Sequence, residues 1–128
     1  MRRLVFIAAC LWPLNQAPAQ AQGFACPGQN GPYVNYAREA LTISSTALPF
    51  TASVYQPSGA PPPLAATVTL ETNPIRTSTN GAPPTAAVGE LWTNGTNVRF
   101  IVCGEANIKR FLAIRTGSDA SLTIAYWN

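Results

Sequence analysis

Residues 111–127 read FLAIRTGSDASLTIAYW, and this stretch decides the fold class. Its last part (SLTIAYW) alternates apolar with polar or small residues, which is the period of a strand with one buried face. Its first part (FLAIRT) alternates in the same way, and the GSDA between the two has the composition of a turn. The stretch therefore predicts a β-hairpin made by residues 111–116 and 121–127.

The chain upstream of this hairpin contains further strand patterns. A second hairpin is predicted where Asn94 and Gly95 separate residues 89–93 from residues 96–103, because both turn residues tolerate positive φ. Residues 65–71 (AATVTLE) alternate clearly and predict an isolated strand. Weaker or shorter patterns predict strands at residues 41–44, 50–55 and 75–79, and one helical turn at residues 105–110.

About seven strands with frequent turns and no long helical period predict an all-β protein. The expected architecture is a single antiparallel β-sandwich, jelly-roll or Ig-like. Its core is expected to form from the apolar positions of the alternating segments. These are Val68, Leu70, Leu91, Val98, Phe100, Val102, Leu112, Ile114, Leu122 and Ile124.

The first 21 residues have the three parts of a cleaved secretory signal peptide. Two arginines follow Met1, an apolar run (LVFIAACLWPL) comes next, and an Ala-Gln-Ala site predicts cleavage before Gln22. The apolar run is about half of the roughly 20 residues that a spanning helix needs, which argues against a stable membrane span. Lipidation at Cys10 is an alternative, disfavoured because the apolar segment before it is short. The mature domain, residues 22–128, is then secreted, periplasmic or at the cell surface, and a virion location is also open.

Two cysteines remain after that cleavage, Cys26 and Cys103. They are expected to form a disulfide, because exported proteins fold in oxidising compartments. The bond would tie an irregular lead-in, residues 22–39, to a late strand. Two free thiols are the alternative.

The composition argues against most catalytic chemistry. The chain has no histidine, which removes Ser-His and Cys-His nucleophile pairs and histidine metal sites. It has no P-loop, dinucleotide glycine pattern or clustered carboxylates, so we expect no cofactor, no metal and no enzyme activity. Glu90 and Glu105 flank one predicted strand and make a weak case for a glycosidase pair. Without Arg2 and Arg3 the chain has six cations and five acids, with no basic cluster that would indicate nucleic-acid binding.

Three aromatic side chains, Trp92, Trp127 and Tyr55, are candidate ligand contacts. Exposed aromatic rings stack on the apolar faces of sugars, so these residues would indicate a carbohydrate site. Packing in the core or at an edge is the alternative for each. Strand alternation places Trp127 on the other face of the strand from Leu122 and Ile124, where its side chain is exposed or covers a second layer.

From residue 65 onward the chain resembles a known group of proteins. The segments that carry the resemblance are VTLET (68–72), PIR (74–76), NGAPPT (80–85), VGEL (88–91), FLAIRTG (111–117) and DASLTIAY (119–126). Over residues 65–127 their order resembles small β-sandwich proteins of tailed-bacteriophage structural modules, of the virion accessory or surface type. The resemblance implies a role without catalysis, and it places Glu71, Arg76 and Arg115 in recurring segments, as candidate structural ion pairs. The signal peptide and the cysteine pair depart from that group, so a bacterial exported relative is the alternative.

Three functions follow from these observations. The favoured hypothesis is a non-catalytic exported or virion-surface subunit, structural or for attachment, whose partners are its own copies or other virion or filament proteins. The first alternative is a secreted carbohydrate-binding module with a glycan ligand. The second is a pilus-like filament subunit that assembles by strand addition, because the terminal alternation LTIAY has the form used in strand exchange.

Overall fold

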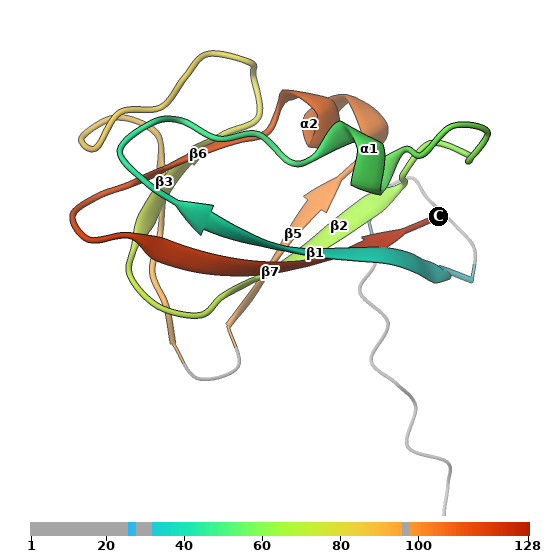
Figure 1. Ribbon diagram of the computed structural model, residues 1–128, viewed down its shortest axis with the longest axis horizontal. Helices are drawn as coiled ribbons and strands as arrows, with labels where there is room; N and C mark the ends of the chain where they lie inside the picture. The colour runs from blue at the N-terminus through green and yellow to red at the C-terminus, as the bar shows by residue number, and fades with distance from the viewer. Residues whose placement is uncertain (1–25, 28–31, 96–97) are drawn as a thin grey trace, which may run out of the picture.

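The computed structural model of the 128-residue chain describes residues 26–27, 32–95 and 98–128. The predicted signal peptide and Cys10 lie outside the described residues. The described chain is a β-sandwich of seven strands in two antiparallel sheets with two short helices, which confirms the predicted all-β fold (Figure 1). Its elements are β1 (Asn35–Ile43), α1 (Ala52–Tyr55), β2 (Ala65–Leu70), β3 (Ile75–Ser78), β4 (Glu90–Trp92), β5 (Arg99–Cys103), α2 (Glu105–Arg110), β6 (Leu112–Arg115) and β7 (Ala120–Trp127).

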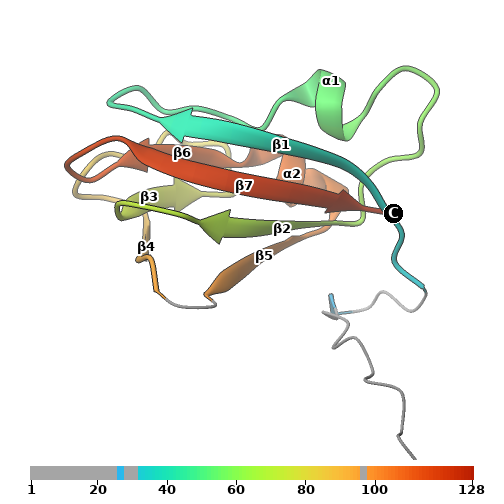
Figure 2. The same cartoon turned by 60° about the horizontal axis from the view of Figure 1, so that its bottom comes forward.

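The larger sheet has four strands in the order β1-β7-β2-β5, which Figure 2 shows from top to bottom. The last strand of the chain, β7, lies inside this sheet and pairs with β1 on one side and β2 on the other. Its residues Leu122, Ile124 and Tyr126 are at most 1 % exposed, which confirms the predicted alternation. β1 begins at Asn35, so the end of the predicted irregular lead-in belongs to the sheet.

The smaller sheet has three strands in the order β4-β3-β6. The short connections β2–β3, β4–β5 and β6–β7 each cross from one sheet to the other. Both predicted hairpins are therefore wrong: β4 pairs with β3 while β5 pairs with β2, and β6 pairs with β3 while β7 pairs with β1 and β2. Turn residues mark where a chain reverses, but they do not specify whether the next strand pairs beside the last one or packs across the core from it.

Residues 50–55 contain a helical turn, α1, and not the predicted strand. In a strand, Phe50 and Tyr55 would point to opposite faces, because they are an odd number of residues apart. The helical turn places both in the core, where they are 3 % and 6 % exposed. The ring of Phe50 stacks on Phe111 with centroids 3.9 Å apart, and Tyr55 packs against Tyr126. The second helical turn, α2, lies at residues 105–110 as predicted.

The core lies between the two sheets. In Figure 1, β3 and β6 lie over one half of the larger sheet, and α1 and α2 lie over the other half. Half of the predicted core residues are buried there. They are Val68, Leu70, Val102, Leu122 and Ile124, with Phe100 partly buried against them.

Four predicted core residues lie elsewhere. Leu91 is exposed because its neighbour Trp92 takes the inner face of β4, and Val98 is exposed just before β5 begins. Leu112 and Ile114 of β6 are half-buried, while Phe111 and Ala113 on the other face are fully buried. The alternation along β6 was correct, but both of its faces carry apolar residues, so the pattern alone could not identify the inner one.

The two sides of the sandwich differ. On one side, called the closed edge, residues 44–48 run beside β6. Leu48 and Ala113 exchange backbone hydrogen bonds of 2.8 and 3.0 Å, and the Arg115 N–H donates to the Ser44 carbonyl at 3.1 Å. On the other side, called the open edge, β4 and β5 have no strand pairing between them in the described chain.

Candidate functional site

β5 is an edge strand of the larger sheet, and on its side away from β2 it carries backbone groups that no strand of the described chain pairs with. The Gly104 N–H donates to the Leu64 carbonyl at 2.7 Å, in the register of the β2–β5 ladder. Because hydrogen-bonded pairs alternate along an antiparallel ladder, the even-numbered residues of β5 face β2. The N–H and C=O groups of Arg99 and Ile101 therefore point away from the sheet.

Exposed apolar side chains gather at the open edge. Leu91 on β4 is 48 % exposed, and Ile101 on β5 is 41 % exposed. Val88 and Val98, which lie just before these strands, are exposed as well. Leu91 and Ile101 point to the outer faces of different sheets, because Trp92 next to Leu91 and Phe100 next to Ile101 take the inner faces. The feature at this edge that is typical of surfaces that contact another chain is therefore the unpaired strand edge.

A cavity of about 310 Å³ opens between β4 and β5 and is lined in part by Glu90, Trp92, Phe100 and Ile101. Trp92 is 4 % exposed, and its ring stacks on Phe100 with centroids 4.2 Å apart. The indole Nε1 of Trp92 has no hydrogen-bond partner in the described part of the chain. A buried donor without an acceptor costs about 1–3 kcal/mol, so an acceptor that reached it through the cavity would be stabilising.

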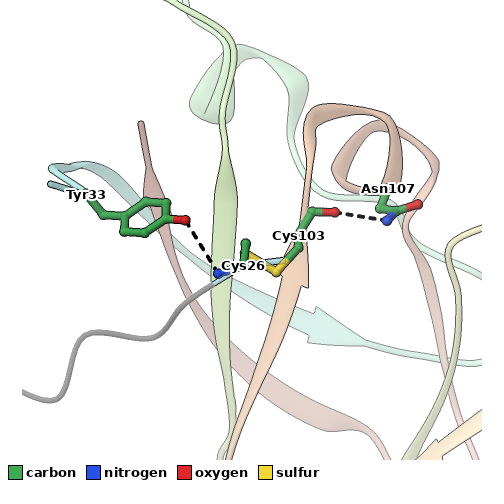
Figure 3. The surroundings of a disulfide bond; sticks show 4 residues. All are labelled: Cys26, Tyr33, Cys103 and Asn107. Carbon is green, nitrogen blue, oxygen red and sulfur yellow. Dashed lines mark hydrogen bonds between the residues drawn. A yellow bond between two sulfur atoms is a disulfide. The ribbon is translucent and has the colours of Figure 1, made fainter. Parts of the chain in front are cut away.

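One end of the open edge is tied down (Figure 3). Cys26 and Cys103 form the predicted disulfide, with S–S 2.00 Å and Cα atoms 5.5 Å apart. The Cys26 N–H donates to the Tyr33 hydroxyl at 3.4 Å, and the Asn107 side-chain amide donates to the Cys103 carbonyl at 2.9 Å. The end of β5 at Cys103 is therefore held by the lead-in and by α2, whereas Ile101 at its middle is not.

The outer face of the larger sheet, on the side away from the core, carries a shallow groove of about 270 Å³. All four strands contribute to it, and no carboxylate lines it. Its residues are Arg38, Thr67, Thr69, Arg99, Thr123, Ala125 and Trp127. A larger hollow, about 670 Å³, adjoins this groove at Thr69 and Arg99 and extends to Glu71.

Trp127 lies across the outer face at one end of this groove. It is half-buried and directly opposite Ala65 in the β2–β7 register. Its Nε1 donates to the Thr67 hydroxyl at 3.1 Å, two residues further along β2. Since Ala65 is fully buried and Thr67 is only 5 % exposed on this outer face, the indole covers this part of the sheet and forms a wall of the groove.

The other two aromatic candidates for ligand contact lie in the core. Trp92 is on the inner face of β4, and the turn of α1 directs Tyr55 inward against Tyr126. Tyr55 is closed to a ligand that approaches from solvent, and Trp92 borders only the cavity between β4 and β5. Of the three predicted aromatic contacts, Trp127 is the one that lines a surface groove.

The charged residues singled out by sequence have different surroundings. Arg115 forms an ion pair with Asp119 across the β6–β7 turn. Arg76 donates from Nη1 to the Gly89 carbonyl at 2.8 Å, and Glu71 is exposed at the end of β2. Within the described residues, neither Glu71 nor Arg76 has an ion-pair partner.

A partly buried polar network that sequence reasoning missed joins α1 to β1 and β7. The Tyr126 hydroxyl donates to Glu39 Oε1, which also accepts the Thr51 N–H at 3.1 Å. The Tyr36 hydroxyl donates to the Tyr55 carbonyl. Burial, and secondly the hydrogen bond to Glu39, raise the pKa of Tyr126 far above its usual value, and burial raises the pKa of Tyr36. Both tyrosines are therefore neutral structural donors at ordinary pH.

The described residues include no group of three or more His, Cys, Asp or Glu side chains that could hold a metal ion. Among them, too, no helix has the length and apolar character needed to cross a bilayer. No protein-family model, curated protein or solved structure matches the chain. Functional inference therefore rests on the two surfaces, the open edge and the outer-face groove.

Proposed function

We propose that this protein is a non-catalytic exported subunit, structural or for attachment, which associates with copies of itself through the open edge. The observation that carries the proposal is the outer side of β5, where unpaired backbone groups flank the exposed side chain of Ile101. Monomeric proteins usually protect such an edge with charges, proline, bulges or a covering segment, because it templates pairing with another chain. Ile101 has none of these protections within the described chain.

The proposed contact is an antiparallel pairing of β5 with β5 of a second copy. A two-fold axis at Ile101 places this residue opposite Ile101 of the second copy and places Arg99 opposite Cys103. No like charges then face each other across the contact. Because the N–H and C=O of Ile101 both point outward, the central pair would exchange two hydrogen bonds. Two four-stranded sheets would become one sheet of eight strands.

The export half of the proposal is supported by the Cys26–Cys103 disulfide. Disulfides persist in oxidising compartments and at virion and cell surfaces, and they are rare in the cytosol. The signal-like N-terminus points the same way. An attachment or accessory role on a virion or on a bacterial surface is consistent with both features.

A filament assembled by strand addition would use the same edge. A strand donated by a neighbouring subunit would lie beside β5, and it could bring a carbonyl to the unpaired Nε1 of Trp92. The terminal strand β7 is a poor donor, because both of its sides are already paired within its own chain. The homotypic β5 contact is therefore the favoured form.

Substitution of Ile101 tests the contact. We expect the purified protein to be dimeric or larger in size-exclusion chromatography with light scattering. We expect Ile101→Lys to be monomeric, because two lysine charges would face each other directly across the two-fold axis. Val34→Lys is the matched control: Val34 is 59 % exposed and lies beside β1, at the opposite edge of the larger sheet.

Two results would contradict the contact: a native protein that is monomeric at all concentrations, or an Ile101→Lys variant with the native mass. Mass spectrometry of the same sample tests export separately, since cleavage before Gln22 removes the first 21 residues. An intact Met1 on protein recovered from the medium, periplasm or particle would contradict that cleavage.

A further inference from the structure

We propose that the groove on the outer face of the larger sheet binds an acidic polysaccharide, carboxylated or sulfated. This site lies on the outer face of the sheet and shares Arg99 with the proposed β5 contact, but its function does not require that contact. The proposal assigns the two arginines of the groove as anion contacts and its hydroxyls and indole as sugar contacts. Each assignment follows from where the residue lies in the sheet.

The two arginines stand at opposite borders of the groove. Arg38 is on β1 and Arg99 is on β5, the two edge strands of the larger sheet. With three strand spacings of about 4.8 Å and an offset of two residues along the strands, their Cα atoms are roughly 15 Å apart. An extended ligand that carries more than one negative charge would reach both.

Neither arginine is neutralised by the protein. The ion pairs among the described residues are Lys109–Glu105 and Arg115–Asp119, and neither pair lines the groove. The Arg38 Nε donates to the Asn35 side-chain oxygen at 3.0 Å, which orients the guanidinium and leaves its two terminal nitrogens available. Two exposed guanidinium groups in a groove that no carboxylate lines favour an anionic ligand, since arginine binds carboxylate and sulfate-like groups in a bidentate manner. Glu71 lies on the same face, in the hollow that adjoins the groove at Arg99.

The floor between the arginines is polar but uncharged. Thr69 and Thr123 are directly opposite each other on β2 and β7, and both side chains point to the outer face. No hydrogen bond within the described chain uses either hydroxyl, so both remain available as donors and acceptors. Sugar hydroxyl groups match such a floor, whereas an acidic protein segment or a simple anion would use only the arginines.

The shape and the aromatic content of the face favour a glycan over a nucleic acid. Sites for single-stranded nucleic acid combine clustered cations with several aromatic rings that stack on successive bases. This groove has two separated cations and one indole, Trp127, at its end. An acidic polysaccharide offers spaced charges, many hydroxyls and apolar ring faces, which correspond to the three kinds of side chain present.

Affinity electrophoresis of the purified protein tests the site with defined probes. Polygalacturonate supplies carboxylates, heparin supplies sulfates, dextran is the neutral control, and single-stranded oligothymidine is the nucleic-acid control. We expect retention by polygalacturonate, heparin or both, weakened by rising ionic strength because the contacts are exposed charges. Dextran and the oligonucleotide should retain the protein much less.

Substitutions then locate the site. Arg38→Gln and Arg99→Gln should each weaken binding about three- to fivefold, as expected for the loss of an exposed charge contact. Arg110→Gln is the matched control, because Arg110 is an exposed arginine on α2 that does not line the groove. Thr123→Val should also weaken binding, with the shape of the side chain preserved. All four variants should keep the native thermal unfolding midpoint.

Several outcomes would overturn the proposal. These are the absence of retention by either acidic polysaccharide, equal retention by dextran, and oligonucleotide binding as tight as that of the polysaccharides. If Arg110→Gln weakened retention as much as the groove variants do, retention would depend on the net charge of the protein and not on the groove, which would also overturn the proposal. Ile101→Lys leaves both arginines in place and adds a positive charge to the same outer face, so loss of self-association with retention kept or strengthened would separate the failure of the open-edge contact from that of this site.

Discussion

The closed and open edges of the sandwich have nearly the same aromatic packing but different backbone closure. At the closed edge Phe50 and Phe111 stack with centroids 3.9 Å apart and planes 4° from parallel. At the open edge Trp92 and Phe100 stack at 4.2 Å and 2°. Backbone hydrogen bonds from residues 44–48 to β6 seal the first pair, whereas a cavity borders the second.

The difference between the two edges separates two contributions to the stability of a β-sandwich: the burial of apolar side chains and the hydrogen bonding of backbone groups at the edges. Stacked aromatic rings bury apolar surface at both edges. Apolar burial at an edge therefore does not depend on backbone hydrogen bonds that connect the two sheets there. Backbone closure satisfies polar groups, and the described chain provides it at one edge. At the open edge the described chain provides no backbone closure, and this is the surface that we propose for self-association.

The largest expected effect comes from removing the ring at the sealed edge. Phe111 is fully buried and packs against both Phe50 and Trp92. Phe111→Ala should lower the free energy of unfolding by about 3–5 kcal/mol, from lost burial and the cavity left behind. Urea unfolding measures it, with Leu91→Ala at the open edge as the control, expected within about 0.5 kcal/mol of the native value. A comparable loss in both variants would mean that the open edge is not exposed in solution.

The next effect concerns the disulfide that ties the lead-in to the end of β5. Replacing both Cys26 and Cys103 by serine should cost about 2–4 kcal/mol, because the bond closes a loop with a sequence separation of 77 residues and constrains the unfolded chain. Thermal unfolding with and without a reductant measures it. The native protein should lose stability on reduction and the double-serine variant should not. Equal stability of the two proteins under oxidising conditions would contradict a stabilising role.

The smallest of the three effects probes the buried network near the closed edge. Tyr126→Phe should cost about 1–3 kcal/mol, because Glu39 loses a buried donor. The folded state also raises the pKa of Tyr126 above its value of about 10 in the unfolded chain. The contribution of Tyr126 to native stability should therefore be constant below about pH 10 and fall above it, since only the unfolded chain then releases this proton. Urea unfolding across that range should show a shallower fall for Tyr126→Phe, and parallel curves would contradict the raised pKa.

The sequence predicted the elements whose signal is local. Strict alternation located β2 and β7 to within about one residue, and residues 105–110 form the expected helical turn. The sequence did not predict which strands pair with each other, because the paired strands lie far apart in the chain. β1 and β7 pair although most of the chain lies between them, and no turn motif encodes such a pairing. Asn94 and Gly95 predicted a hairpin, but the connection that contains them joins strands of different sheets.

The candidate surfaces were only partly visible for the same reason. Alternation already placed Thr67, Thr69 and Trp127 on the face opposite the core residues. The positions of Arg38 and Arg99 at the borders of that face depend on β1 and β5 being the edge strands, which is a property of the topology. The sequence predicts Leu91 in the core because apolar residues are usually buried. In β4 the inner face is taken by Trp92, and a segment with adjacent apolar residues does not reveal which of them faces inward.

The position of β7 inside the larger sheet has a consequence for biosynthesis. Ribosomes produce a chain from its N-terminus, and domains fold as units once their parts are available. Here β1 and β2 do not pair with each other, and both pair with β7, which is the last of the seven strands in sequence. The larger sheet therefore cannot form until residues 120–127 have been synthesised, and until then β1 and β2 both lack their native partner strand.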